Sequence, residues 1–139
     1  MPPRDPLKLK IQLLCGDEIA MGPGKADLLD AIAAHGSISA AARAMDMSYR
    51  RAWLLVDAMN RCWSTPLVET SPGRAQGSGA RLSDSGSRVL DRYRKLQHAL
   101  ASTAHGALLD DLDADLRPAP KPRPSDLRRA SRKNASKED

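Results

Sequence analysis

The chain has 139 residues, of which 41% are hydrophobic and 28% charged, and its formal net charge is +5 at pH 7. This length suits one domain with a small core. No run approaches the ~18 consecutive apolar residues of a membrane span, and residues 1–6 lack the apolar segment of a secretory signal. Cys15 and Cys62 are too few for a disulfide framework. These features exclude membrane proteins, secreted mini-proteins and large multidomain enzymes, and we expect a cytoplasmic protein.

Positive charge is concentrated in two segments. Residues 43–95 carry ten basic side chains against five acidic ones, nine of the ten being Arg, and residues 117–139 carry eight against three. Residues 105–116 contain four Asp and neither Lys nor Arg. Because guanidinium groups suit bidentate contacts with phosphate and guanine, this distribution favours a polyanion, most often nucleic acid. A solvated basic face has the same composition, so charge alone does not decide.

The N-terminal third predicts a hairpin followed by a helix. Residues 7–13 alternate apolar and polar side chains, as in a strand with one buried face, and residues 17–21 suit its hairpin partner. Gly22-Pro23-Gly24 is predicted to break the chain. A helix with an apolar stripe is predicted over residues 25–35, and Gly36 suits its C-terminal end.

Two further helices with a tight break between them come next. Residues 40–45 predict a short helix rich in Ala, with Ser37 or Ser39 as its N-cap. After a two-residue break, Ser48 is predicted to cap a third helix that ends near Cys62. Its apolar residues recur at i, i+3, i+4 and i+7, the spacing of a helix with one buried face.

A second hairpin and a last helix complete the ordered part. Residues 66–70 and 80–82 predict strands on either side of a Gly-rich loop over residues 71–79. Ser83 or Ser85 is predicted to cap the helix that follows. The apolar residues of this helix are spaced four, three and four apart, as in helices that pair with another helix. They are Val89, Tyr93, Leu96 and Leu100.

The predicted fold is mainly α. It is a winged helix-turn-helix with an N-terminal β-hairpin, a β-hairpin wing and a long C-terminal helix. We assign residues 1–6 to an N-terminal tail and residues 7–116 to this domain. Residues 117–139 are predicted to be a disordered basic tail, because four prolines lie between residues 118 and 124 and the remainder is charged and rich in Ser and Ala.

The third helix carries the candidate DNA-reading residues. In a helix-turn-helix unit the second helix enters the major groove with its N-terminal residues leading. Arg side chains bind guanine O6 and N7, and a helix N-terminus attracts phosphate. We therefore expect Arg50 and Arg51 to read bases. The residues expected to position phosphates are Ser39, Ser48 and Tyr49.

The predicted wing carries a second set of contacts. We expect Arg74, Gln76 and Arg81 to hold the wing against phosphates or in a minor groove. The loop between the strands is glycine-rich, but it contains neither G-x-x-x-x-G-K-[ST] nor G-x-G-x-x-G. It also precedes a strand rather than a helix, so the sequence argues against a nucleotide-binding loop.

No catalytic or metal-binding pattern is present. The sequence contains no recognisable nucleophile–base or acid–base set, so we expect no enzyme activity. His98 and His105 lie two helical turns apart, and no Cys or Glu accompanies them at ligand spacing. We therefore expect no metal and no cofactor, and we expect Cys62 to be a small buried hydrophobic residue.

Residues 36–45, Gly-Ser-Ile-Ser-Ala-Ala-Ala-Arg-Ala-Met, resemble the G-S-[IF]-[ST]-x-A-A opening of LysR-type regulators. Together with residues 47–53, 67–70 and 80–83, they are similar to the N-terminal winged-helix domain of the molybdate-responsive ModE-type regulators. The pattern G-S-I-S-x-x-A-x-x-x-x-x-S-Y-[KR]-x-A-W of that family is complete here. The resemblance covers about residues 7–101.

The resemblance implies a transcriptional regulator that binds double-stranded DNA as a homodimer formed by the last helix, with no membrane contact. It also implies a link to molybdenum, with molybdate as an effector. The residues after Ala101 are rich in Pro and charge and lack strand alternation. We therefore expect the molbindin domains, which bind molybdate or tungstate in that family, to be absent, and a partner protein is a candidate sensor.

The alternative is a winged helix that docks on another protein. Leu54 is predicted to face outward beside Arg50, which is unusual for a plain surface helix. Trp53 is expected to flank the core rather than to stack on a base, and Tyr49 either bonds a phosphate or packs on the short helix. The salt dependence of binding separates the two hypotheses. Raising the salt concentration weakens DNA binding by orders of magnitude, because binding releases counterions, whereas the affinity of an apolar protein interface changes little.

Overall fold

The computed structural model describes residues 4–71 and 79–137, and the chain divides into two compact units. The first unit spans Lys8–Ala104, and the second combines the residues up to Leu7 with those from His105 onward. The predicted domain continued to residue 116, whereas the division lies at Ala104. No helix among the described residues is both long enough and apolar enough to cross a bilayer.

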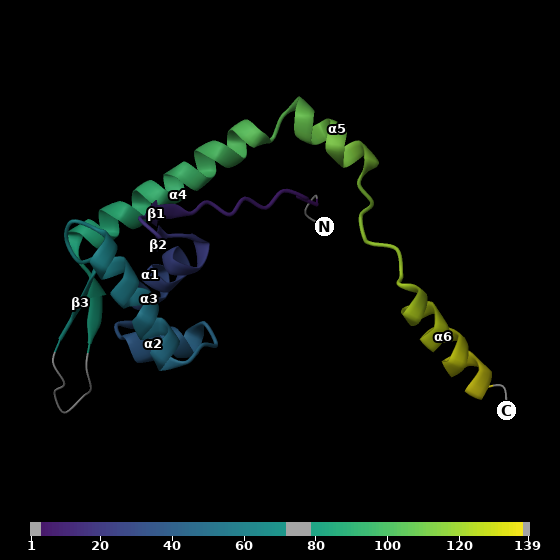
Figure 1. Ribbon diagram of the computed structural model, residues 1–139, viewed down its shortest axis with the longest axis horizontal. Helices are drawn as coiled ribbons and strands as arrows, with labels where there is room; N and C mark the ends of the chain where they lie inside the picture. Colours follow the sequence, from purple (N-terminus) through teal and green to yellow (C-terminus); the bar gives the residue numbers. More distant parts are fainter. Residues whose placement is uncertain (1–3, 72–78, 138–139) are drawn as a thin grey trace. The chain divides into compact units, whose positions relative to one another are not determined.

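The first unit consists of two small hairpins and four helices. Figure 1 shows α1, α2 and α3 gathered beside one end of α4. Each hairpin is a separate antiparallel pair, β1 with β2 and β3 with β4. In chain order the elements are β1 (Leu13–Cys15), β2 (Glu18–Met21), α1 (Pro23–His35), α2 (Ile38–Ala44), α3 (Tyr49–Cys62), β3 (Val68–Thr70), β4 (Ala80–Leu82) and α4 (Asp84–Ala104). The structure is a mainly α winged helix, as the sequence predicts.

The first hairpin is shorter than predicted. Of the predicted first strand, residues 7–13, only Leu13 pairs with β2, opposite Met21, and β1 continues beyond the prediction to Cys15. The chain enters α1 at Pro23, so no strand residues remain to pair with residues 7–12. Pro23 begins the helix rather than breaking the chain, because the first helical turn needs no N–H from that position.

The helix ends follow local chemistry. Gly36 ends α1 in the left-handed conformation, with φ of 76°. Of the two candidate caps for α2, Ser37 is the N-cap, since its side chain accepts a hydrogen bond from the Ala40 N–H. Of the two candidates for α4, Ser83 accepts the hydrogen bond from the Gly86 N–H at 3.0 Å.

The core is aliphatic and is formed mainly by the first three helices. Leu28, Leu29 and Ile32 of α1 are fully buried, and Val56 and Met59 of α3 pack in the same cluster. The small side chains of α2 allow its backbone to approach these helices closely. Among the described residues the only buried aromatic side chain is Tyr93, which the chain supplies from α4.

The backbone at Leu67 joins α3, the wing and α4. The Asn60 Oδ1 atom accepts hydrogen bonds from the N–H groups of Leu67 and Val68, at 2.9 and 3.1 Å, and its Nδ2 donates to the Val68 carbonyl. The Ser83 N–H donates to the Leu67 carbonyl at 2.8 Å. A Cβ on Gly86 would lie 2.1 Å from the Leu67 oxygen. We call Asn60, residues 66–68, Ser83 and Gly86 the Leu67 joint.

The second unit contains two exposed helices, α5 (Ala107–Asp115) and α6 (Pro124–Lys137). The leucines after Ala101 do not continue α4, because the chain is extended at Gly106 and begins a new helix there. The segment predicted to be a basic tail contains α6. The prolines end at Pro124, which suits a helix start, and no Pro or Gly follows it to interrupt the helix.

Replacing Gly86 with Ala tests the close approach at the Leu67 joint. The added methyl group would overlap the Leu67 backbone, which cannot move without disturbing the hydrogen bonds of Asn60 and Ser83. We expect the free energy of unfolding to fall by about 1–3 kcal/mol or more, measured by urea denaturation. The control is Ser87→Ala at the exposed neighbouring position, and equal effects of the two substitutions would contradict the packing account.

Candidate nucleic-acid interface

The unit formed by α2 and α3 depends on a tight turn at Asp46. This residue adopts a left-handed conformation with φ of 54°, one that Asp tolerates better than most residues. The Met47 N–H donates back to the Ala42 carbonyl at 3.0 Å, which holds the end of α2 against the turn. Ser48 then caps α3 by accepting a hydrogen bond from the Arg51 N–H at 3.1 Å. The N-terminus of α3 is therefore fixed relative to α2.

The first turn of α3 presents polar side chains to solvent. Tyr49 is 53% exposed, and Arg50 and Arg51 are exposed beside it. Ser48 is also exposed, although its hydroxyl oxygen already serves as the cap. Ser39 is exposed in the first turn of α2. The structure therefore leaves accessible all five predicted contact residues of the helix-turn-helix unit.

Ion pairs separate the arginines into two groups. Arg61, at the far end of α3, pairs with Asp57 and Glu18, and these hydrogen-bonded carboxylates raise its pKa. In the portion of the chain that the structure describes, the guanidinium groups of Arg50 and Arg51 form no ion pair. A cation without a protein counter-ion is available to an anion from outside, so the N-terminus of α3 is the electropositive end of this helix.

The wing supplies one predicted contact residue that can be placed. Arg81 lies in β4 opposite Glu69 of β3, and its Nε atom donates to the Glu69 carboxylate at 3.1 Å. Its side chain is nonetheless 82% exposed, so this surface ion pair is weak and easily exchanged. Arg74 and Gln76, the other two predicted wing contacts, lie outside the described residues.

An apolar strip continues from the same end of α3. Trp53 is 47% exposed and Leu54 is 48% exposed. They follow Tyr49 and Arg50 by one helical turn each, so the four side chains form one continuous surface. The outward position of Leu54 agrees with the sequence, whereas Trp53 is more open to solvent than its predicted position beside the core.

The predicted dimer residues of α4 divide between the core and the surface. Tyr93 is 2% exposed, its hydroxyl donates to the Ile11 carbonyl at 2.6 Å, and burial raises its pKa. Val89 is half-buried against the core. Leu96 and Leu100 are 38% and 42% exposed. The first two side chains stabilise their own domain, and the last two are open to a partner.

Sequence reasoning missed Asn60, which organises the wing. Its amide makes three hydrogen bonds to the backbone of Leu67 and Val68 and so fixes where β3 begins relative to α3. An Asn within a helix is an unfavoured choice, and such a residue in the last turn of a helix was the available signal.

This arrangement of a capped short helix, a tight turn, an exposed second helix and a β-hairpin defines a winged helix-turn-helix domain. Residues 25–87 match the family described as bacterial regulatory helix-turn-helix protein, lysR family. Over these residues the chain is therefore similar to LysR-type helix-turn-helix domains, and the relatives described next include ModE proteins. Such domains belong to DNA-binding transcriptional regulators.

Three relatives indicate the extent of this similarity. The molybdenum-pterin-binding protein MopA of Rhodobacter capsulatus is 39% identical over 80 residues, which are 58% of this chain and 30% of MopA. The molybdenum transport protein ModE of Azotobacter vinelandii is 40% identical over 78 residues, which are 56% of this chain and 29% of that ModE. The DNA-binding transcriptional dual regulator ModE of Escherichia coli is 34% identical over 105 residues, 76% and 38%. The chain therefore spans about a third of the length of these relatives.

Proposed function

We propose that this protein is a transcriptional regulator that binds operator DNA as a homodimer and acts in molybdenum homeostasis. The observation that carries the DNA-binding part is the N-terminus of α3, where Arg50 and Arg51 are exposed and form no ion pair within the described residues. Arg50 and Arg51 enter the major groove and bond base edges. The flanking phosphates are contacted by Ser39, Ser48 and Tyr49. The wing contacts the adjacent DNA backbone through Arg74, Gln76 and Arg81.

The homodimer part of the proposal rests on the exposed leucines of α4. Leu96 and Leu100 lie one turn apart on α4, beyond Val89, Leu90 and Tyr93, through which this helix packs on the core. Two such helices pack together and place two α3 helices on one face of a duplex. The operator is then a pseudo-palindrome with half-sites one helical turn, or a multiple of it, apart.

The molybdenum part rests on the relatives named for molybdenum transport or binding. In the part of the chain that the structure describes, the residues after Ala101 form only helices and irregular segments. The molybdate response therefore requires a sensor outside these residues, such as a partner protein.

The second candidate function is docking on another protein, which the exposed Trp53 and Leu54 favour. Trp is among the residues most enriched at the energetic centres of protein interfaces, and an exposed Leu beside it enlarges the apolar surface. They also suit DNA, since an apolar side chain beside an Arg can contact a thymine methyl group. The experiment below distinguishes the two.

Replacing Arg50 or Arg51 with Ala tests the DNA contact directly. Each good bidentate contact to a base contributes roughly 1–3 kcal/mol, so we expect each substitution to weaken binding about 10- to 100-fold and to relax the preference for one base pair. Fluorescence anisotropy with a selected duplex library, at low and moderate salt and with and without molybdate, measures both effects.

The matched control for this titration is Arg61→Ala, which removes the same charge from the far end of the same helix. We expect it to change duplex affinity little. Selective binding that disappears in the Arg50 and Arg51 variants and falls steeply with salt supports the proposal. Binding equally weakened by all three variants, or no selective binding at either salt, would contradict it and favour protein docking.

Introducing Asp at Leu96 and Leu100 together tests the proposed dimer. A carboxylate buried between two helices is costly, so we expect the dissociation constant of the dimer to rise at least about 30-fold, the equivalent of ~2 kcal/mol. Sedimentation velocity measures the oligomeric state. Ser102→Asp, an exposed position across the same helix, is the control, and a double variant that stays dimeric would refute the α4 interface.

The basic tail is proposed to add affinity without sequence preference. Its helix α6 exposes four basic side chains, Arg128, Arg129, Arg132 and Lys133. Replacing these four with Gln should lower affinity for operator and random duplexes by the same factor and reduce the salt dependence, because phosphate contacts carry no sequence information. Anisotropy titrations with both duplexes measure this, and a loss confined to the operator would count against a purely electrostatic tail.

A further inference from the structure

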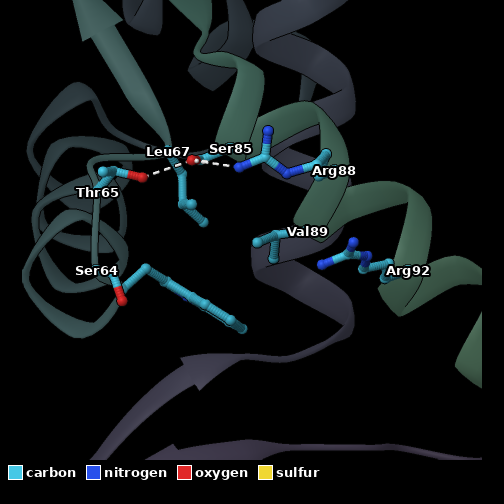
Figure 2. Close-up of a pocket in the computed structure, with 8 residues that line it drawn as sticks. Ser64, Thr65, Leu67, Ser85, Arg88, Val89 and Arg92 are labelled. Carbon is cyan, nitrogen blue, oxygen red and sulfur yellow. Dashed lines mark hydrogen bonds between the residues drawn. The ribbon is translucent and has the colours of Figure 1, made fainter.

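A hollow of about 370 Å³ lies between the loop that follows α3 and the N-terminal part of α4, as Figure 2 shows. Ser64 and Thr65 line it from the loop, and Arg88 and Arg92 line it from α4. Its volume lies within the range of roughly 300–1,000 Å³ typical of small-molecule sites. None of its lining residues belongs to the proposed DNA-contacting set.

Hydroxyl groups orient one of the two arginines at this hollow. The Arg88 Nη2 atom donates to the Ser85 Oγ atom at 3.1 Å, and the same oxygen shares a hydrogen bond with the Thr65 Oγ1 atom. In Figure 2 this chain of bonds runs along the upper edge of the hollow, and Arg92 extends from α4 below these bonds. Because Arg88 and Arg92 are one helical turn apart, both guanidinium groups lie on the same face of α4.

Neither of these guanidinium groups has an acidic partner among the residues that the structure describes. Arg94 on the same helix differs, since it bonds Asp27 and Asp30 of α1 and these carboxylates raise its pKa. Two adjacent arginines without carboxylates form a site of positive potential, and the fork of each guanidinium matches the paired oxygens of a phosphate, sulfate or carboxylate.

The remaining wall of the hollow is apolar and fixed in position. The Trp63 indole N–H donates to the Ala20 carbonyl at 3.0 Å, which anchors the ring. Leu67 is fully buried, and Val89 packs partly against the core beside it. An anchored aromatic ring next to two aliphatic side chains suits a flat apolar group, and the two arginines of α4 suit the charged end of such a ligand.

We propose that this hollow binds a small organic anion. Arg88 and Arg92 bind its oxyanion group, the Ser64 and Thr65 hydroxyls supply further hydrogen bonds, and its flat apolar part lies against Trp63. The inference goes beyond the proposed DNA-binding function. A ligand here touches the loop that follows α3 and the N-terminal part of α4, the helix that the proposed regulator uses for dimer formation.

Tryptophan fluorescence tests this proposal with phenyl phosphate as the probe. The chain has two tryptophans, so Trp53→Phe leaves Trp63 as the single reporter. We expect a saturable change in Trp63 emission with half-saturation below about 10 mM, and weaker binding of inorganic phosphate, which lacks the ring. Arg92→Gln and Arg88→Gln, each in this background, should weaken phenyl phosphate binding at least about tenfold, since each removes a charge-assisted contact.

The control is Arg43→Gln in the same background, which lowers the net charge equally at an exposed position of α2, outside both the hollow and the proposed DNA-contacting set. Unchanged binding in this control, with loss in the Arg88 and Arg92 variants, supports the site. No saturable change, or equal binding by all variants, overturns it. A duplex that displaces phenyl phosphate, together with an Arg92→Gln effect on duplex affinity as large as that of Arg50→Ala, would assign the hollow to a DNA phosphate and also overturn it. The titration of phenyl phosphate alone contains no DNA, so a failure of operator binding does not affect its outcome.

Discussion

The Leu67 joint is the constraint on which the geometry of this domain depends. Three structural elements meet at the backbone of Leu67 and Val68. Asn60 of α3 bonds these two residues, which begin the wing, and Ser83 and Gly86 bring the start of α4 against the Leu67 carbonyl. Buried backbone groups must be paired, and here one side chain and one cap pair them. The wing and α4 are therefore positioned relative to α3 by hydrogen bonds rather than by the small hydrophobic core alone.

This constraint explains how so small a core maintains an exposed functional surface. The core is formed by aliphatic side chains of α1, α2 and α3, and the first turn of α3 lies outside it. The side chains of Arg50 and Arg51 are therefore accessible, and they form no ion pair with any residue that the structure describes. Other arginines are engaged within the protein. Arg61 and Arg94 each bridge two carboxylates and so connect α3 to β2 and α4 to α1. The same residue type thus stabilises the domain at some positions and is available to an external anion at others.

Much of this architecture could be predicted from local sequence, because helix caps and breaks act over a few residues. Gly36 and Ser48 were assigned correctly on that basis, whereas the choice between Ser37 and Ser39 needed the backbone conformation. The predicted strand over residues 7–13 shares only Leu13 with β1, since alternation indicates a buried face but cannot supply a pairing partner. Asn60 and the hollow beside Arg88 were not foreseen, because both depend on contacts between segments that are distant in sequence. The predicted roles of Arg74 and Gln76 stay predictions.

The length of α4 has a mechanical consequence for the part of the helix that extends beyond the core. A helix of 21 residues extends ~32 Å, and only its first half packs against the core of its own domain. The packed half is held from the Leu67 joint as far as Tyr93 and Arg94, which bond Ile11 and α1, so the pivot of the outer half lies at these two residues. The helix beyond Arg94 extends about 15 Å, and a tilt of about 10° at the pivot displaces its end by about 3 Å, comparable to the rise of one base pair. Small rearrangements at the pivot are thus amplified into changes of spacing that a DNA duplex, with its fixed helical repeat, would detect.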